Sequence, residues 1–356
     1  MEKNNKTLNV PNLRFPEFSG EWERCKIKQV CDITTGNKNT QDKSDDGIYP
    51  FYVRSQTVER INSWSFDGEA ILTAGDGVGV GKVFHYSTGK IGVHQRVYIL
   101  SNFTCDSKYL FHYFSSRFYG RVKRMSAKNS VDSVRMEMIA DMPIYLASKD
   151  EQLKIGNLLS LLDERIETQK KIIEKYESLI RGICKKLTRQ GAANKAINEC
   201  LECHSSTLQE SSILENGKHP VYGATGVCGY TDSNDISDDS ILIIKDGASV
   251  GTTYYASGYY SHIGTLNRLT AREGVNPRYI YYCLKVMNFA PYKTGLAIPH
   301  IYFKDYGKHK IWCPPHEQQS YIANILRQID DKIQVEKSLL EQLNSQKRYM
   351  LHQLFI

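Results

Sequence analysis

An apolar heptad pattern over residues 151–187 constrains the fold of this chain most strongly. Its seam positions are Ile155, Leu159, Leu162, Ile166, Gln169, Ile173, Tyr176, Ile180, Ile183 and Leu187, of which only Gln169 is polar. Steps of four and three residues alternate, and this 3.5-residue period lets a long helix bury a narrow seam while the intervening Lys, Glu and Arg stay in water. The pattern predicts a coiled-coil helix that needs a partner.

A matching pattern recurs 167 residues later in the same chain. It comprises Ile322, Leu326, Ile329, Ile333, Glu336, Leu340, Leu343, Lys347, Met350 and Leu354. We expect an intramolecular pair, and in an antiparallel pairing Gln169 and Glu336 would meet near the middle, where polar groups can fix the register. The predicted helix-pair seam is Leu162, Ile166, Gln169, Ile173 and Tyr176 with Ile329, Ile333, Glu336, Leu340 and Leu343.

The segment before each helix also repeats. At a constant offset of 170, Tyr52 matches Tyr222, Asp76-Gly77 matches Asp246-Gly247, and Tyr109 matches Tyr279, whereas residues 36–47 differ strongly from residues 206–217. A repeat that keeps its scaffold and varies its loops is typical of two copies of one fold that bind two different things.

Short apolar segments predict strands near residues 27–33, 49–53, 70–74, 83–86 and 97–100, and helical spacing marks residues 108–118. The predicted parts are an extended lead-in (1–21), a first mixed α/β domain (22–146), a central long helix (147–190), a second domain (191–313) and a C-terminal long helix (314–356). The fold class is therefore α+β, with two similar mixed α/β domains separated by two long antiparallel coiled-coil helices and pseudo-twofold symmetry within one chain.

The amino-acid composition limits the classes of partner that this chain can bind. The chain has 46 Lys and Arg against 39 Asp and Glu, a net charge of +7, which suits a polyanionic partner without requiring one. We find no stretch of about 20 apolar residues and no signal peptide, so we expect a cytoplasmic protein without a membrane partner. The nine cysteines lack disulfide-framework spacing, which favours reduced thiols.

The glycine-rich segment 75–81 invites comparison with a phosphate-binding loop. It fails that pattern because Asp76 and Val83 stand where the motif needs Gly and Ser or Thr. The second copy keeps only Asp246, Gly247, Val250 and Gly251 of it. A tight turn between two strands is the better interpretation.

Two further motifs resemble functional patterns by coincidence. Residues 200–204 match the haem-attachment pattern, yet no export signal accompanies them, and a zinc site from Cys200, Cys203, His204 and Cys228 lacks a second closely spaced pair. Asn276-Pro-Arg-Tyr279 departs from the Asn/Asp-Pro-Pro-Tyr element of amino-methyltransferases at Arg278, and it more simply starts a helix. The sequence thus predicts no catalytic residue and no metal site.

Basic and polar residues on the variable loops remain as candidates for DNA contact. Arg and Lys suit phosphates and guanine edges, and Asn, Gln, Ser and Thr suit adenine. In copy one the candidates are Asn37, Lys38, Asn39, Thr40, Arg54, Ser55, Gln56, Lys82, His94, Gln95, Arg96, Lys128 and Asn129. In copy two they are His219, Thr225, Thr252, Thr253, Asn267, Arg268, Lys293, Thr294 and His300.

Together these motifs resemble the specificity (S) subunits of type I restriction-modification systems. The resemblance rests on Asn12-Leu-Arg-Phe-Pro-Glu-Phe with Glu21-Trp22-Glu23, on Pro220-Val-Tyr-Gly-Ala-Thr-Gly, on the paired Asp-Gly-x-x-Val-Gly turns and on the openings of both helices. It implies two target recognition domains that each read one half of a bipartite double-stranded DNA site, with the helices as spacer. A 37-residue helix is about 55 Å long, against about 34 Å for one DNA turn.

The resemblance also implies that the chain is not an enzyme and holds no cofactor. Two modification (methyltransferase) subunits with S-adenosylmethionine, and restriction/translocase subunits with ATP and Mg, would supply the chemistry. An S-like subunit of another phage-defence methyltransferase system is the alternative. A stand-alone enzyme would need cofactor motifs that the sequence lacks, and a purely structural coiled coil would show no DNA affinity.

Overall fold

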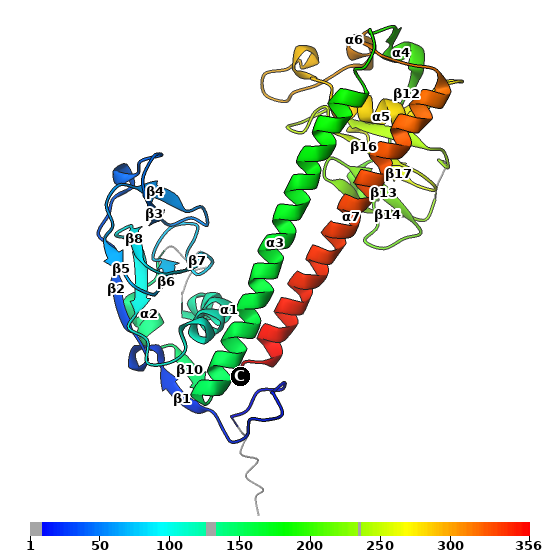
Figure 1. Ribbon diagram of the computed structural model, residues 1–356. Coiled ribbons are helices and arrows are strands. Elements are labelled where there is room, and N and C mark those ends of the chain that lie inside the picture. The colour runs from blue at the N-terminus through cyan, green and yellow to red at the C-terminus, as the bar shows by residue number, and fades with distance from the viewer. Residues whose placement is uncertain (1–8, 126–132, 234–235) are drawn as a thin grey trace, which may run out of the picture. The chain divides into compact units, whose positions relative to one another are not determined.

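The computed structural model describes residues 9–125, 133–233 and 236–356 (Figure 1). The chain divides into two compact units, which are described separately: unit 1 is Met1–Gln169 with Leu339–Ile356, and unit 2 is Lys170–Ser338. Each unit therefore contains part of both long helices, α3 (Lys149–Leu187) and α7 (His316–Gln353).

Unit 1 is built on two four-stranded sheets. The first has the order β2-β9-β6-β7 and is antiparallel, with strands Asp32–Thr35, Val97–Ser101, Ala70–Ala74 and Phe84–Ser87. The second has the order β4-β3-β8-β5, with strands Glu59–Ile61, Tyr49–Tyr52, Lys90–Val93 and Phe66–Asp67, and its β3 and β8 are parallel. A separate pair joins β1 (Glu23–Lys26) to β10 (Pro143–Leu146), and the short helices are η1 (Ile27–Gln29), η2 (Thr40–Asp42) and α2 (Met136–Ala140).

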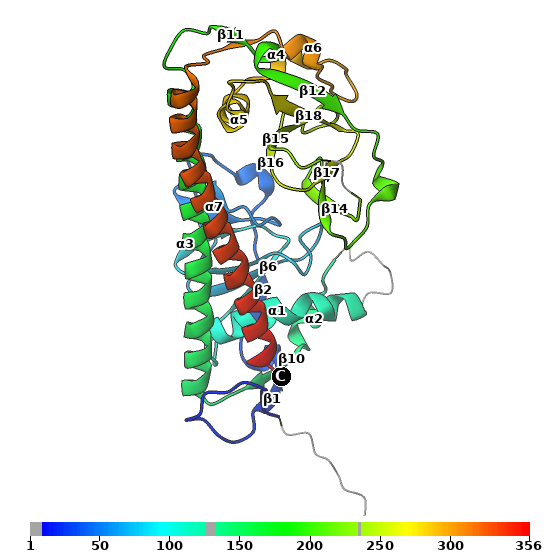
Figure 2. The same ribbon diagram turned by 90° about the vertical axis from the view of Figure 1, so that its right-hand side faces the viewer.

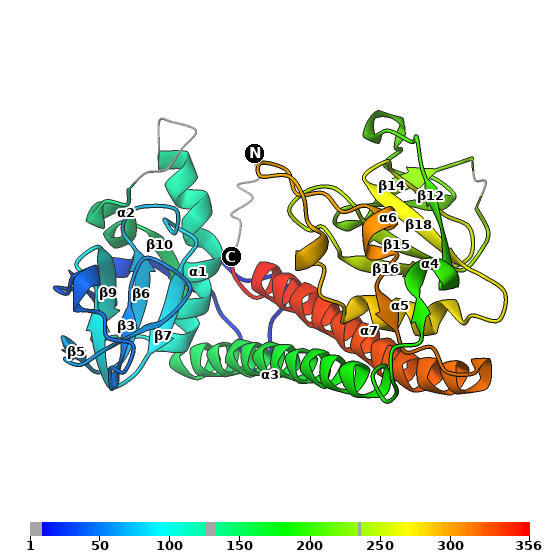
Figure 3. The same ribbon diagram turned by 90° about the horizontal axis from the view of Figure 1, so that it is seen from above.

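Helix α1 (Ser107–Met125) covers β6 and β7 of unit 1, as Figure 3 shows. Leu110, Phe114, Phe118 and Val122 recur every four residues and are buried, which is the apolar stripe a core-facing helix needs. The start of α3 joins the same core through Ile155 and Leu159, and the residues directly after α7 join it through Leu354 and Phe355, so these two helix segments run antiparallel within the unit.

Unit 2 repeats this plan. Its first sheet has the order β12-β18-β15-β16, with strands Leu201–Ser205, Leu266–Ala271, Ser240–Ile244 and Thr253–Ala256. Its second sheet is β14-β13-β17 (Gly226–Thr231, His219–Gly223 and Ser261–His262), and β11 (Lys195–Ala196) pairs with β19 (Lys310–Ile311). The helices are α4 (Ile197–Cys200), α5 (Pro277–Lys285), α6 (Phe303–Tyr306), η3 (Glu210–Ser212) and η4 (Ala290–Tyr292), and α5 lies beside β15 and β16 (Figure 2).

The repeat extends to strand register. Tyr52 lies opposite Val93 in a parallel pair, and Tyr222 lies opposite His262 in the corresponding parallel pair of unit 2. The first sheets also share their strand order. These observations confirm two similar mixed α/β parts with long helices.

The predicted seam residues lie on the inner faces of the helices within each unit. Ile166, Gln169, Ile173, Ile333, Glu336 and Leu343 are buried, and Leu162, Tyr176, Ile329 and Leu340 are half-buried. Ion pairs flank the seam: Asp163 contacts Lys347 in unit 1, and Glu177 lies 2.7 Å from Lys337 in unit 2.

Two segments differ from expectation. The strand predicted over 27–33 is wrong in its first part, because the Gln29 side chain accepts a hydrogen bond from the Lys26 amide and closes a helical turn before β2 begins. Residues 9–21 of the predicted lead-in pack on unit 1: Arg14 donates two hydrogen bonds of 2.8 Å to the buried carboxylate of Glu151, and the Leu13 amide donates to the Gln353 carbonyl.

No helix among the described residues combines the length and the apolar character that a bilayer span requires.

Candidate nucleic-acid interface

Four loops gather at one end of the sheets of unit 1. The loops follow β2, β3, β6 and β8, and the strand directions bring those carboxyl ends to the same edge. Backbone hydrogen bonds tie the loops together: the Gln95 amide donates to the Lys38 carbonyl, the Gly75 amide to the Arg96 carbonyl, and the His94 amide to the Tyr52 carbonyl. Side chains from distant parts of the sequence therefore share one rigid platform.

The glycine-rich segment 75–81 is the turn between β6 and β7, as predicted. A Cβ atom on Gly79 would lie 2.4 Å from the Arg54 carbonyl oxygen, so glycine lets this turn press against the loop after β3. The turn thereby brings Asp76 close to Arg54.

Asp76 lies between two arginines of this platform. Arg54 Nη1 donates to Asp76 Oδ1 at 2.8 Å, and Arg96 Nε lies 3.7 Å from Asp76 Oδ2. Both arginine side chains are largely exposed. A guanidinium has five N–H donors, so a single carboxylate can orient each fork while leaving donors for a guanine edge or a phosphate.

His94 is buried beneath this pair and serves as a support. Its Nδ1 accepts a hydrogen bond from the Arg96 amide at 3.0 Å, which leaves the proton on Nε2 facing Thr40 Oγ1 at 3.3 Å. Burial lowers the pKa of His94, and the positive charge of Arg54 lowers it further. The neutral ring fixes Thr40 and Arg96 and is poorly placed to bind phosphate itself.

The remaining candidates of unit 1 differ in exposure and partners. Lys38 Nζ donates to Ser63 Oγ at 2.8 Å, Ser55 Oγ donates to the Thr57 carbonyl, and the Asn39 amide donates to Asp42. Asn37, Gln56 and Gln95 are exposed. Lys128 and Asn129 lie outside the described residues.

Lys82, in the connection between β6 and β7, belongs to a second basic group around Tyr119 of α1. Its Nζ lies 5.3 Å from the centre of the Tyr119 ring, and Lys123 Nζ lies 4.8 Å from the same ring. Two ammonium groups on one aromatic ring are suited to a backbone phosphate. Arg121, by contrast, donates to the Met138 and Asp141 carbonyls and so holds α1 to α2 and the turn after it.

The corresponding end of unit 2 carries a different set of groups. His300 Nδ1 lies 2.7 Å from Asp246 Oδ1, and since a carboxylate only accepts, the ring donates from Nδ1. Thr294 and His300 exchange two backbone hydrogen bonds of 2.9 and 2.7 Å. Thr252, Thr253 and Lys293 line a surface hollow nearby, and Thr225 is exposed on the turn from β13 to β14.

Three candidates of unit 2 differ from this group in position or in burial. His219 begins β13 at the opposite end and packs against Tyr259, with ring centroids 5.5 Å apart. Arg268 lies within β18 and reaches Ser240, and Asn267 is buried with its side-chain oxygen near Ser205 Oγ. His219 and the Arg268 side chain therefore lie toward the other end of the sheets, whereas Asn267 pairs with Ser205 and Ile243 near the platform end but is buried.

Sequence reasoning missed Asp76 and Asp246 as site residues, although it used both as anchors of the repeat. Their strict repetition at the start of the glycine-rich turn was the available signal. It also missed the exposed Leu296 and Ile298, because an apolar residue in a loop carries no pattern of its own.

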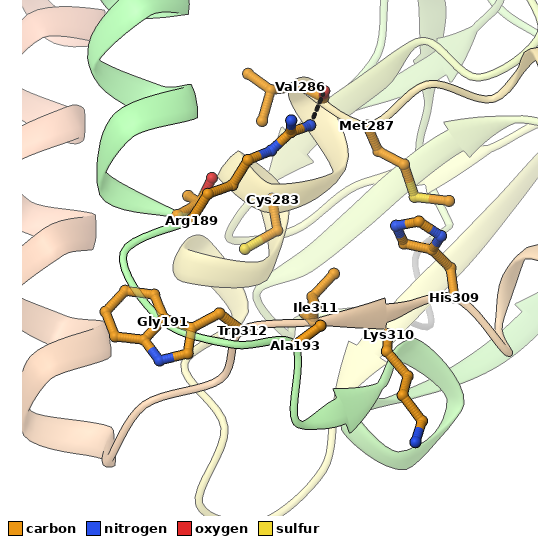
Figure 4. A pocket seen from close by; sticks show the side chains of 11 residues that line it. Arg189, Gly191, Ala193, Cys283, Val286, Met287, His309, Lys310, Ile311 and Trp312 are labelled. Carbon is orange, nitrogen blue, oxygen red and sulfur yellow. Dashed lines mark hydrogen bonds between the residues drawn. The ribbon is translucent and has the colours of Figure 1, made fainter.

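A separate pocket in unit 2, shown in Figure 4, contains none of the candidates. It lies between the end of α3, the end of α5 and β19, and Met287, Ile311 and Trp312 give it a mainly apolar lining. Arg189 donates to the Val286 carbonyl at its rim, and His309 is paired with Tyr292. Over the described ranges, no group of three or more His, Cys, Asp or Glu could hold a metal ion.

Comparison with known proteins identifies the family. The sequence matches the family described as the type I restriction modification DNA specificity domain over residues 19–178 and again over 193–345. It is 27% identical over 164 residues to the type I restriction enzyme EcoDI specificity subunit of Escherichia coli, covering 45% of this chain and 35% of that subunit. It is 23% identical over 281 residues to a putative type I specificity subunit of Mycoplasma genitalium, covering 72% of this chain and 73% of that one.

Solved structures share the fold. The S subunit of a type I restriction-modification system from M. genitalium superposes with a TM-score of 0.74 at 20% identity, covering 98% of this chain and 99% of that one. A chain from a structure of the type I R-M system, described for complex assembly and conformational transition, gives a TM-score of 0.53 at 14% identity over 93% of this chain and 96% of that one.

The two matched ranges are the two copies of the repeat, and together they cover most of the chain. The relatives named above are specificity subunits, a non-catalytic class. The chain therefore belongs to the type I restriction-modification DNA specificity family.

Proposed function

We propose that this chain recognises a bipartite double-stranded DNA site, with each unit reading one half of it. The observation that carries the proposal is the repeated Asp-Gly turn, which holds a different polar set on the same scaffold in each copy: Arg54 and Arg96 around Asp76, and His300 on Asp246. Because the two units carry different side chains at equivalent positions, we expect them to read different base sequences in the two half-sites.

The first unit is suited to a half-site containing guanine. Asp76 orients the donor fork of Arg54 by a hydrogen bond, and Arg96 places a second exposed guanidinium beside the same carboxylate. A bidentate arginine is the commonest reader of guanine O6 and N7. Lys82 and Lys123 on Tyr119 would hold a phosphate and set the register of the unit on the duplex.

The long helices would set the gap between the half-sites. Helix α3 is continuous over 39 residues and α7 over 38, so a heptad inserted in both, after Glu167 and before Val335, adds about 10 Å of helix. We expect the gap in the recognised site to lengthen, and an unchanged gap would refute the role as spacer.

Methylation and cleavage would lie in partner subunits. Modification subunits, two for two half-sites, would bind S-adenosylmethionine, and restriction/translocase subunits would use ATP and Mg. The helices and the flanks of the two units would provide their docking surface.

Sequencing of methylated adenines in the source genome, with and without this gene, tests the proposal. We expect one bipartite motif to lose methylation when the gene is deleted and to regain it on complementation. The Arg54→Ala chain should regain it incompletely or with relaxed specificity in one half. Methylation by the purified chain alone, or a motif that survives the deletion, would contradict the proposal.

A further inference from the structure

We infer that the apolar tip formed by Leu296, Ala297 and Ile298 reads thymine methyl groups in the half-site of unit 2. This inference deepens the proposed function and rests on it. The tip stands out because Leu296 is fully exposed and Ile298 is 58% exposed, on a loop whose flanks are tightly fixed.

The base of the loop is closed by hydrogen bonds on both sides. Thr294 and His300 pair through their backbones, the Gly247 amide donates to the Pro299 carbonyl, and the Ile301 amide donates to the Lys245 carbonyl. The His300 ring is also bound to Asp246. The tip is thus held out from a fixed base that belongs to the candidate platform.

The surroundings of the tip favour nucleic acid as its partner. Lys293 and Thr294 are exposed and are separated from the tip only by Gly295, while Thr252 and Thr253 share the adjacent hollow with Lys293. A cation and hydroxyl donors around a small aliphatic tip match a DNA major groove, where phosphates flank base edges. If the partner were a hydrophobic surface of another protein, we would expect apolar residues around the tip in place of Lys293 and the threonines.

In the DNA major groove, thymine supplies the apolar group that the tip could contact. Its C5-methyl group projects into the major groove, and apolar side chains discriminate it from cytosine by direct contact. Leucine and isoleucine side chains cannot donate or accept hydrogen bonds, so the tip can add specificity only through such a methyl group or by entering a base step. The hydroxyl and imidazole groups beside it suit base edges in the major groove, which favours the methyl contact.

Replacing each thymine of the unit 2 half-site by uracil tests the inference, because uracil lacks only the methyl group. The binding affinity of the full chain with its modification subunits is measured on duplexes that carry the motif identified by methylation sequencing. We expect one thymine-to-uracil change to weaken binding of the unaltered chain about fourfold, the effect of burying one methyl group. Leu296→Ala or Ile298→Ala should abolish that sensitivity.

Matched controls separate this contact from general effects. Leu214→Ala removes another exposed leucine, which pairs with Tyr230 at the opposite end of the second sheet, and it should leave the uracil effect intact. Uracil in the half-site of unit 1 should change the binding affinity by the same factor for the unaltered chain and for Leu296→Ala. The inference would be overturned if the thymine-to-uracil change weakened binding of both tip variants as much as that of the unaltered chain. It would also be overturned if 2-aminopurine fluorescence showed base unstacking only when Leu296 is present. Failure of the unaltered chain to prefer its methylated motif would instead overturn the proposed function.

Discussion

Arg54 and Asp76 are joined by a hydrogen bond of 2.8 Å, although each residue follows a different strand in a different sheet of unit 1. The pairing depends on the close approach of Gly79 to the Arg54 backbone. Asp76 thus acts as a positioning residue for the arginine fork.

Arg54→Ala should weaken binding to the cognate site by about 1–3 kcal/mol and relax base preference at one position of the first half-site. The control is Lys43→Ala, because Lys43 is engaged by Glu59 at 2.8 Å and should affect base preference little. Binding to a library of site variants provides the measurement. A loss that is uniform across sequences, with a smaller salt dependence, would assign Arg54 to a phosphate instead.

His262→Val should stabilise unit 2 by about 1–2 kcal/mol at neutral pH. His262 is buried, and neither ring nitrogen has a hydrogen-bond partner among the described residues. An unsatisfied buried polar group costs free energy, and Val93 occupies the corresponding position of unit 1. Urea unfolding of both chains measures the difference, and equal stability would show that the ring is satisfied in solution.

The same variant should flatten the dependence of stability on pH. Burial lowers the pKa of His262 from 6.5 to about 4, so below pH 6.5 the unfolded chain binds a proton that the folded chain refuses. Protonation of His262 therefore leaves the free energy of unfolding unchanged above pH 6.5 and lowers it as the pH drops toward 4. At pH 5 the loss is about 2 kcal/mol. His262→Val should lose that component, as unfolding at pH 5 and pH 8 would show, and an unaltered slope would contradict the assignment.

Gly156→Ala should destabilise unit 1 even though alanine favours helix. A Cβ on Gly156 would lie 2.5 Å from Asp106 Oδ1 and 2.9 Å from the Tyr109 amide, where α1 approaches α3. Gly182 in the same helix has nothing within 4 Å, so Gly182→Ala should stabilise by about 0.5–1 kcal/mol. Thermal unfolding of the two variants should shift in opposite directions, and parallel shifts would argue against close helix contact at Gly156.

Arg14→Ala should cost about 3 kcal/mol of stability, because it leaves the fully buried Glu151 carboxylate without its bidentate partner. Adding Glu151→Gln should recover part of the loss, since the neutral amide removes the unpaired charge. Denaturant titration of the single and double variants tests this. An additive further loss in the double variant would mean that the charge of Glu151 is stabilised by other groups.

The sequence predicted the long helices and the repeat because both leave periodic signals. The heptad marked α3 and α7 almost to their ends, and the constant offset aligned Tyr52 with Tyr222 and Asp76 with Asp246. Short strands, such as the four-residue β8 in which Gly92 separates Ile91 from Val93, left too weak a pattern to be predicted.

The site was harder to predict than the fold because it depends on long-range contacts. Choosing polar loop residues brought in Arg54 and Arg96, but it also included Asn267, which is buried, and His219, which lies at the other end of its strand. Which end of a strand a residue occupies follows from pairing between distant segments, and composition alone does not contain that information.

Exchanging residues 22–146 for the first recognition domain of another family member tests the central claim most directly. The methylated motif is then read by sequencing the genome of a strain that carries the chimera with its modification subunits. We predict that one half of the bipartite motif changes, while the other half and the gap stay as they were. A change in both halves, or in neither, would contradict the assignment of one half-site to each unit.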